Sequence, residues 1–461
     1  MLVTMPQLTR REFFRAGGVG VAGYHLLPML APRNVRAASK VEPRGGAEVT
    51  ILLFLSGGAS QTDTFDVREG RWTPPDFDIR TITPGLRMPA GLLPSLSRQT
   101  GRYCILRSLE AWEIDHGRGS YYVQAGRLLS PARIKEIPSV GAVIAYETAG
   151  RRKESDYLPP FVAMNVVTSP GMQLVGPGVL PASCGPMALF STDPPPFLVP
   201  EPERDRFRRR LEMLKDLDSG WRQEDGGRGR LFRELDGKYQ GAYPLLGNPR
   251  VAEVFKVATE EHQRYGSSAL GDACVLARNI VQENRGSRFI LISHGGWDLH
   301  RNAYDKTAKV NQYTLCRELD SALGSLLEDL ASRTDERRRP LLDKALVVCM
   351  GEFGRTTGEL STQKGRDHYR HASSAVFAGG GVKGGKVLGA TDETGARIVD
   401  PGWSQKRSIY PEDVLVSIYS AMGVDWTKKI TQTLSGRPFD YIENISPNGY
   451  MQFSEVSDLF A

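Results

Sequence analysis

Cysteine and histidine are both scarce in this chain. Its 461 residues include only five cysteines, and no two of them are spaced as a Cys-x-x-Cys pair. We therefore expect no disulfide framework. Only seven histidines are present, and one of them, His25, belongs to the N-terminal segment.

The chain also lacks a large charge surplus and a long apolar run. Its net charge is +6, but residues 1–38 hold five arginines and one glutamate, which leaves about +2 for the remainder. So small a surplus argues against nucleic acid as a partner. No later segment is long and apolar enough to span a bilayer. We expect no nucleic-acid partner and no permanent membrane span in the mature chain.

The N-terminal segment has the pattern of an export signal. Arg10 and Arg11 precede Phe13, a mildly apolar stretch occupies residues 16–30, and small residues follow around Ala37. A charged start, an apolar middle and a small-residue exit are typical of secretory signals, and the paired arginines favour the twin-arginine route. We predict a twin-arginine signal peptide at residues 1–38, the twin-arginine translocase as a partner, and a periplasmic or secreted mature protein.

Short apolar runs alternate with helical patterns in the rest of the chain. Strands are predicted at residues 49–56, 288–293, 345–351 and 374–379, and weaker candidates lie at 103–106 and 161–167. Apolar spacing predicts a helix over 312–330 and a long helix or helix pair over 249–284. The alternation predicts an α/β fold with a mostly parallel central sheet and helices on both faces. We expect one domain over residues 39–461, with a loop-and-helix insertion or cap at 168–248.

Polar side chains flank the predicted strands at the positions where open α/β sheets bind ligands. Four of the six histidines outside the N-terminal segment are among them, and the full set is Asp63, Asp66, His294, Asp298, His300, Glu352, Arg355, Asp367, His368 and His371. Imidazoles mixed with carboxylates suit Zn, Mn or Fe, whereas all-oxygen sites suit Ca or Mg. We therefore expect a divalent metal cofactor, with Zn, Mn, Fe and Ca as the candidates.

Five segments carry motifs in a fixed order. They read SGGASQTDTFD (56–66), GGWDLH (295–300), GEFGRT (351–356), GRDH (365–368) and GGGVKGGKVLGATDETG (379–395). Together they resemble the domain-of-unknown-function 1501 family, whose members are exported, sulfatase-like proteins grouped with the alkaline-phosphatase superfamily. The resemblance implies an alkaline-phosphatase/sulfatase-like fold.

The same resemblance implies a metal site. Superfamily members carry a metal-binding Asp at the end of the first strand, where this chain has Ser56-Gly57-Gly58, so Asp63 or Asp66 would substitute from the loop. The remaining metal candidates are matched to later superfamily motifs or lie beside them, and they are Asp298, His300, Glu352, Asp367 and His368.

The implied catalytic residues are His116, Arg355 and Arg118. His116 stands where sulfatases have their nucleophile, so it would act as nucleophile, as general acid/base or as an extra metal ligand. Arg355 and Arg118 would pair with an anionic substrate.

Three functions stay open at this point. The first is a metal-dependent hydrolase or transferase acting on phosphate or sulfate esters. The second is a non-catalytic envelope module that binds an anionic glycan, a metal or a partner protein, which the missing strand-end Asp would explain. The third is a phosphomutase-like transferase, because a fold does not fix its chemistry.

Overall fold

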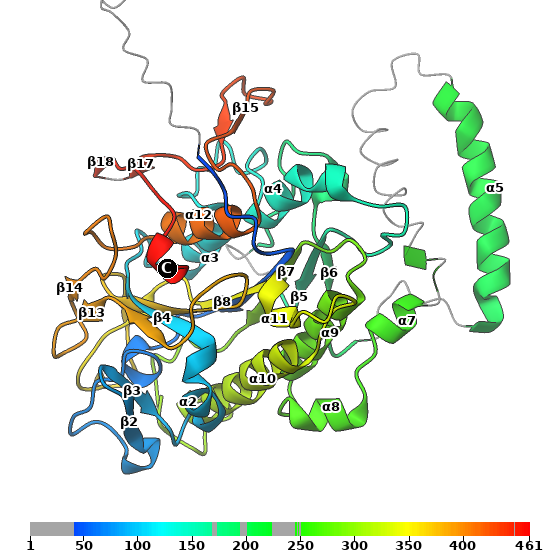
Figure 1. Ribbon diagram of the computed structural model, residues 1–461. Helices are drawn as coiled ribbons and strands as arrows, with labels where there is room; N and C mark the ends of the chain where they lie inside the picture. The colour runs from blue at the N-terminus through cyan, green and yellow to red at the C-terminus, as the bar shows by residue number, and fades with distance from the viewer. Residues whose placement is uncertain are drawn as a thin grey trace, which may run out of the picture. The chain divides into compact units, whose positions relative to one another are not determined.

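An eight-stranded sheet lies at the centre of the unit Pro43–Ala461 (Figure 1). This computed structural model describes residues 41–167, 173–193, 201–223, 245–246, 248, 250–446 and 448–461, so the predicted signal peptide lies outside the described residues. The strands follow the order β12-β4-β11-β8-β1-β7-β5-β6. Their bounds are β1 Val49–Leu55, β4 Tyr103–Leu109, β5 Phe161–Met164, β6 Met187–Leu189, β7 Phe289–His294, β8 Ala345–Met350, β11 Ser373–Ala378 and β12 Lys386–Leu388.

Strand direction in this sheet decides which loops meet. All neighbouring strands are parallel except β11, which runs antiparallel to both β8 and β4. The predicted fold class and the six predicted strands are therefore confirmed. Because β11 is reversed, it begins at the end of the sheet where β1, β7 and β8 finish. The segment before β11 thus lies beside the segments that follow those three strands.

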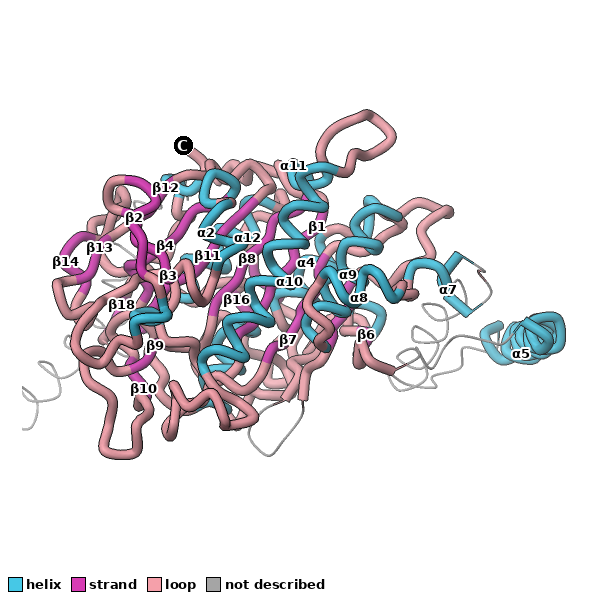
Figure 2. The backbone as a smooth tube through the Cα atoms, turned by 90° about the horizontal axis from the view of Figure 1, so that it is seen from below, coloured by secondary structure: helices cyan, strands magenta, loops and turns pink. Residues whose placement is uncertain are grey.

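Helices cover both faces of the sheet (Figure 1), with one layer of them in front of the strands in Figure 2, and the side chains of strand β1 show why. Successive side chains of a strand point to opposite faces. Ile51 and Leu53 belong to the core shared with α9 (Ala269–Glu283) and α10 (Gln312–Ser332). Leu52 and Phe54 belong to the core shared with α4 (Val140–Glu147) and α12 (Pro411–Ala421). Burying each such side chain contributes about 1.5–3 kcal/mol, so β1 stabilises both layers.

The other elements are shorter or lie around this core. The helices are α2 Pro94–Arg98, α3 His116–Ala125, α5 Arg204–Gln223, α7 Arg250–Val254, α8 Thr259–Arg264 and α11 Leu341–Lys344. Small two-stranded sheets pair β2 Ile79–Thr83 with β3 Leu86–Pro89, β9 Gly354–Arg355 with β10 His368–Tyr369, β13 Ala390–Thr391 with β14 Ile398–Asp400, β15 Lys429–Ile430 with β16 Phe439–Asp440, and β17 Ile445–Ser446 with β18 Gly449–Tyr450.

Two details differ from the expected organisation. The pattern at 249–284 forms three helices, α7, α8 and α9. Between α8 and α9 the chain turns at Gly266, and α9 begins with Ser268 as its N-cap. The region 168–248, of which only parts are described, contains β6. This strand extends the central sheet by pairing with β5, so it is not part of a separate cap.

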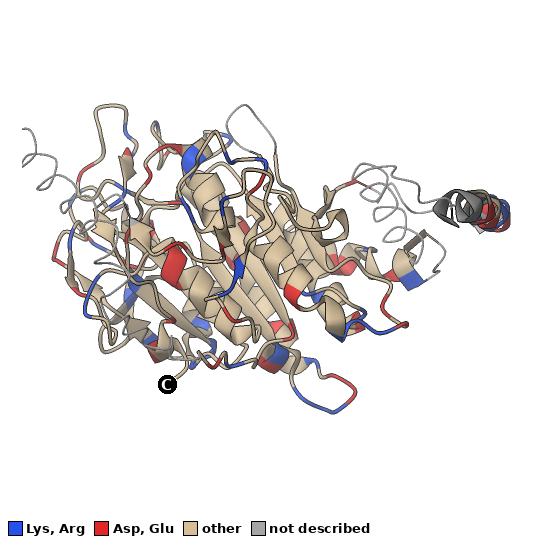
Figure 3. Cartoon of the chain, turned by 90° about the horizontal axis from the view of Figure 1, so that it is seen from above, with Lys and Arg blue, Asp and Glu red and all other residues tan. Residues whose placement is uncertain are grey.

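Charged residues lie mainly outside the central sheet, whereas the cysteines are buried. Lys, Arg, Asp and Glu lie mainly in the loops and helices around the central sheet, whose strands are mostly uncharged (Figure 3). All five cysteines are buried and free. Among the described helices, none combines the length and the apolarity that crossing a membrane requires.

Candidate metal centre

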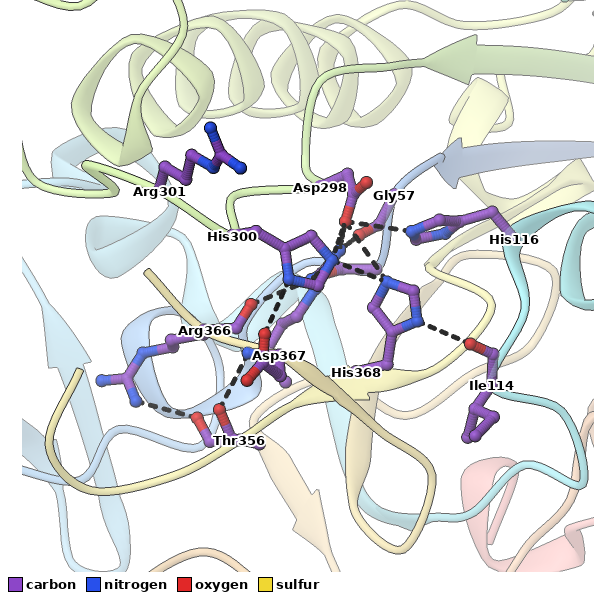
Figure 4. A network of polar contacts seen from close by, with 12 residues as sticks. Gly57, Ile114, His116, Asp298, His300, Arg301, Thr356, Arg366, Asp367 and His368 are labelled. Atoms are coloured by element: carbon purple, nitrogen blue, oxygen red, sulfur yellow. Dashed lines mark hydrogen bonds and ion pairs between the residues drawn. The ribbon is translucent and has the colours of Figure 1, made fainter. Parts of the chain in front are cut away.

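Four side chains from three segments converge at the end of the sheet where β1, β7 and β8 finish. They are His116 at the start of α3, Asp298 and His300 after β7, and His368 in β10. One potential ligand atom from each lies within 4.8 Å of the other three. Figure 4 shows the imidazoles of His300 and His368 directed toward each other and Asp298 between them and His116. The reversal of β11 explains why His368 reaches this place.

Asp298 is the shared neighbour of the three imidazoles. Its Oδ1 atom lies 3.0 Å from Nε2 of His116, 3.0 Å from Nε2 of His300 and 3.3 Å from Nε2 of His368. The Nε2 atoms of His300 and His368 are themselves 3.0 Å apart. The side chain of Asp298 is 45% exposed and that of His116 is 20% exposed, so the cluster is accessible to solvent.

Each imidazole is anchored through its other nitrogen. Nδ1 of His116 lies 2.6 Å from Oε1 of Glu352, and Nδ1 of His300 lies 2.7 Å from Oδ1 of Asp367. Nδ1 of His368 lies 2.6 Å from the carbonyl oxygen of Ile114. All three partners are acceptors, so each Nδ1 carries the proton and donates it. In neutral histidine this leaves Nε2 with a lone pair, the tautomer that binds a metal.

The unpaired nitrogen atoms of the cluster suit a bound cation. The buried Nε2 atom of His116 has no hydrogen-bond partner of acceptable geometry, although Asp298 is close by. The Nε2 atoms of His300 and His368 face each other as two lone pairs. Two acceptors 3.0 Å apart are unfavourable unless a proton or a metal lies between them, and the contact of Nη1 of Arg355 with Nε2 of His300 is long, at 3.4 Å.

The pKa values of His116 and Asp298 also favour a bound cation. Burial opposes its protonation, but the contacts with Asp298 and Glu352 outweigh burial and raise the pKa of His116 to about 9. Burial alone would raise the pKa of Asp298, yet His116 and Arg355 hold that pKa well below its usual value. Asp298 and Glu352 therefore attract positive charge at His116, whereas burial, Arg355 and His116 lower the pKa of His368 and favour its neutral, metal-binding form. A metal ion would take the place of the proton on His116.

Glu352 connects the cluster to the end of β1. Its side chain is fully buried, and its two oxygens accept hydrogen bonds from the N–H groups of Gly57 (2.9 Å) and Gly58 (3.1 Å). Both glycines have positive φ, and a Cβ on Gly57 would lie 2.5 Å from the backbone nitrogen of Asp298. The strand end that lacks the superfamily's Asp is thus shaped to receive Glu352. Glu352, a predicted metal ligand, lies beside the cluster and positions His116.

Arg355 is buried behind the cluster with its donors used. Its Nε donates to the carbonyl of Gly58 (3.0 Å), and its Nη1 donates to the carbonyl of Arg366 (3.0 Å) and contacts Nε2 of His300 (3.4 Å). Its Nη2 donates to the carbonyl of Gly57 and to Asp298. The side chain is 2% exposed. The guanidinium therefore has no donor left for the anionic substrate that the sequence assigned to it, and it positions Asp298.

Asp63 lies outside the cluster, in a buried ion pair. Its carboxylate receives two hydrogen bonds from Arg366, at 2.8 and 3.1 Å, and a third from the Tyr304 hydroxyl at 2.8 Å. Asp66, the other loop candidate, is also buried, accepts from Thr391 and forms ion pairs with arginines. The structure therefore places neither residue where it would replace the missing strand-end ligand.

The other predicted residues surround the centre. Asp367 orients His300 and is itself largely exposed. Arg118, in the first turn of α3, is exposed and bonds through Nε to Glu113 at 2.7 Å. His294 and His371 are not part of the cluster. Sequence reasoning missed Arg366 and the carbonyl of Ile114; Arg366 stands inside the GRDH motif, whereas a backbone carbonyl leaves no signal in the sequence.

Fold and site together define an α/β protein with a candidate metal centre of three imidazoles and one carboxylate. The chain belongs to the family described as protein of unknown function DUF1501, whose model matches residues 47–446, so the expected membership is confirmed. None of the curated proteins matches it significantly.

Several solved structures resemble the chain at low identity. One is a protein in the alkaline phosphatase superfamily from Vibrio parahaemolyticus (12% identity, 83% of this chain, 69% of that chain, TM-score 0.37). Another is the phosphonate monoester hydrolase SpPMH from Silicibacter pomeroyi (10% identity, 82% and 74% covered, TM-score 0.37). A third is the C-terminal periplasmic domain of EcEptC from Escherichia coli, in complex with Zn (11% identity, 84% and 84% covered, TM-score 0.34).

Proposed function

We propose that this protein is a metal-dependent hydrolase of phosphate or sulfate esters. The observation that carries the proposal is the convergence of three Nδ1-anchored imidazoles on Asp298 at a solvent-accessible end of the sheet. Three nitrogens and one oxygen suit Zn, Fe or Mn, whereas Ca prefers oxygen ligands throughout. We therefore place Ca last among the four candidate metals.

The chain's own residues divide the work around such an ion. His116, His300, His368 and Asp298 would hold it, and the ion would supply Lewis-acid chemistry to an ester oxygen. Glu352 and Asp367 fix two of the imidazole tautomers, and Arg355 fixes Asp298. Arg118, exposed two residues after His116, is the cation we propose for the ester anion.

The geometry around His116 helps to choose between two roles, metal ligand and nucleophile. Its two nitrogens face Glu352 and Asp298, which is the arrangement of a metal ligand backed by a carboxylate. We therefore favour ligation over nucleophilic attack. His116→Ala is expected to lower metal content and turnover together. Full turnover by this variant on every substrate found would contradict either role.

The test is metal content measured together with turnover. The full chain is purified from cells that export it, as wild type, Asp298→Ala and the control Asp425→Ala, whose carboxylate caps an exposed turn. We expect stoichiometric Zn, Fe or Mn in wild type and control, and little in Asp298→Ala. Ester hydrolysis should disappear on chelation and return with the metal. Absence of both metal and turnover contradicts the proposal; bound metal without turnover on phosphate and sulfate esters supports the non-catalytic module.

We also propose that residues 1–38 direct export through the twin-arginine translocase, so that the mature protein acts in the periplasm or outside the cell. Five buried, free cysteines suit a protein that folds in a reducing compartment before export. Replacing Arg10 and Arg11 by lysine should leave uncleaved precursor in the cytoplasm on cell fractionation. Unchanged export of that variant would exclude the twin-arginine route.

A further inference from the structure

A second polar cavity lies at the opposite end of the sheet from the metal cluster. Its volume is about 350 Å³. Glu48, Arg288 and Lys344 line it, and each of them immediately precedes a strand: β1, β7 and β8 respectively. The metal cluster follows the other ends of the same strands, so the two sites are separated by the length of the sheet.

Lys344 is the buried cation of this cavity. It ends helix α11 and is 4% exposed. Its ammonium makes no hydrogen bond or ion pair with any residue that the structure describes. Burial lowers the pKa of Lys344. Lys344 Nζ is not among the fully buried polar atoms without a partner, so the ammonium faces the cavity while its stem is buried. A partly desolvated ammonium without a countercharge is unfavourable, and a bound anion would supply that countercharge.

The carboxylates nearest to Lys344 are already occupied. Glu48 lies 3.3 Å from Nη2 of Arg339, and Asp335 lies 2.9 Å from the same nitrogen. Glu283, also in the lining, pairs with Arg250 at 3.2 Å. Asp156 and Glu336 are the lining carboxylates for which no such arginine partner is found among the described residues.

The cations of the lining, in contrast, are mostly unpaired. Within the described ranges, five besides Lys344 have no carboxylate at ion-pair distance, and they are Arg151, Lys153, Arg285, Arg288 and Arg337. Arg285 and Arg288 are half-buried, so their guanidinium groups are not simply dispersed in solvent. The cavity therefore has a local excess of positive charge, although the chain after residue 38 carries only about +2.

We propose that this cavity binds an oxyanion, as a phosphate or sulfate group carried on a small ligand, with Lys344 as its buried contact and Arg285 and Arg288 as its outer contacts. A volume near the lower limit of ordinary ligand pockets fits an anion with a small organic group. Guanidinium and ammonium donors are the groups that bind such oxygens. This site does not depend on the metal centre or on the proposed hydrolysis.

The test measures anion binding without metal or turnover. The chelator-treated full chain is titrated calorimetrically with inorganic phosphate, inorganic sulfate and a hexose 6-phosphate. Wild type and Asp298→Ala should bind with the same affinity, because the metal ligands are remote. Tighter binding of the hexose phosphate than of inorganic phosphate would show that the cavity prefers an anion carried on an organic ligand. Equal binding of the two would show that it prefers the free ion. Loss of binding in Asp298→Ala, or no binding of any of the three anions by wild type, overturns the proposal.

Two variants locate the site. Lys344→Met removes a desolvated charge and keeps an apolar stem, so the protein should fold normally; binding should weaken at least tenfold. Lys309→Met, on an exposed loop, is the control and should bind like wild type. Arg285→Met should weaken binding several-fold and serves as a second probe should Lys344→Met fold poorly. Wild-type affinity in either Lys344→Met or Arg285→Met, when folded, overturns the assignment.

Discussion

The Nδ1 atom of His116 lies 2.6 Å from the Oε1 atom of Glu352, and this contact links the candidate metal centre to the backbone at the end of β1. The same buried carboxylate accepts the N–H groups of Gly57 and Gly58. Glu352 therefore joins helix α3, the loop after β1 and the loop after β8. A change in this one residue would disturb both the orientation of a metal ligand and the shape of the strand end.

Glu352→Gln is expected to weaken metal binding by about 10–100-fold, which is typical for loss of a carboxylate that supports a histidine ligand. An amide presents one acceptor oxygen where the carboxylate presents two, so it cannot satisfy Gly57, Gly58 and His116 together. Metal titration with a competing chelator measures the change. Glu359→Gln, which alters an exposed ion pair with Arg71, is the control. Equal metal affinity in the two variants would show that Glu352 does not support His116.

Much of the fold is predictable from local patterns. β1, β7, β8 and β11 are mostly apolar, and their burial is nearly complete, so composition alone indicates buried strands. His300 and His368 are recognisable as candidate site residues because histidine is scarce in this chain and these two lie next to the ends of predicted strands. Asp298 is recognisable because it lies two residues before His300 in the same segment. The direction of β11 is what brings His368 to the others, and the sequence does not reveal it.

The roles of Arg355 and Asp63 are not predictable in the same way. An arginine or aspartate near a strand end suits a ligand site and a structural ion pair equally well. The choice depends on what faces the side chain, and those groups come from far away in the sequence. Arg366 faces Asp63 across 303 residues, and the carbonyl of Gly58 faces Arg355 across 297.

Arg355→Lys should destabilise the fold and slow turnover without weakening substrate binding. Lysine offers three donors in place of five, so some of the buried carbonyls of Gly57, Gly58 and Arg366 lose their partner, at about 1–3 kcal/mol each. Urea unfolding should show a loss of about 2 kcal/mol or more. Turnover should show a lower kcat because Asp298 is no longer held.

Arg118→Lys is the matched comparison, because Arg118 is exposed. It should change stability by less than about 0.5 kcal/mol and raise KM. The reverse pattern, with Arg355→Lys stable and altered only in KM, would make Arg355 the group that binds the anion.

Asp63→Asn should separate a structural role from a metal-binding role. The substitution leaves the Arg366 guanidinium buried without a countercharge, which typically costs about 3–5 kcal/mol. Metal content per folded molecule should stay at the wild-type level, because Asp63 lies outside the cluster. Thermal unfolding and elemental analysis of the same samples test both statements. Normal stability with lost metal would place Asp63 among the ligands after all.

Glu412→Gln should make the protein more stable at pH 8 and flatten its pH dependence. Glu412 is fully buried in α12, and its carboxyl accepts a hydrogen bond from the Tyr122 hydroxyl. Burial raises the pKa of Glu412 from 4.5 to about 8. Between these values the folded state keeps a proton that the unfolded state loses, so the free energy of unfolding falls as pH rises from about 4.5 to about 8. Glutamine still accepts a hydrogen bond from Tyr122 but has no proton to lose.

Urea unfolding at pH 5 and pH 8 should therefore show a smaller difference in the free energy of unfolding for Glu412→Gln than for wild type or for the exposed control Glu359→Gln. An identical difference in all three would mean that Glu412 is not protonated in the folded protein at pH 7.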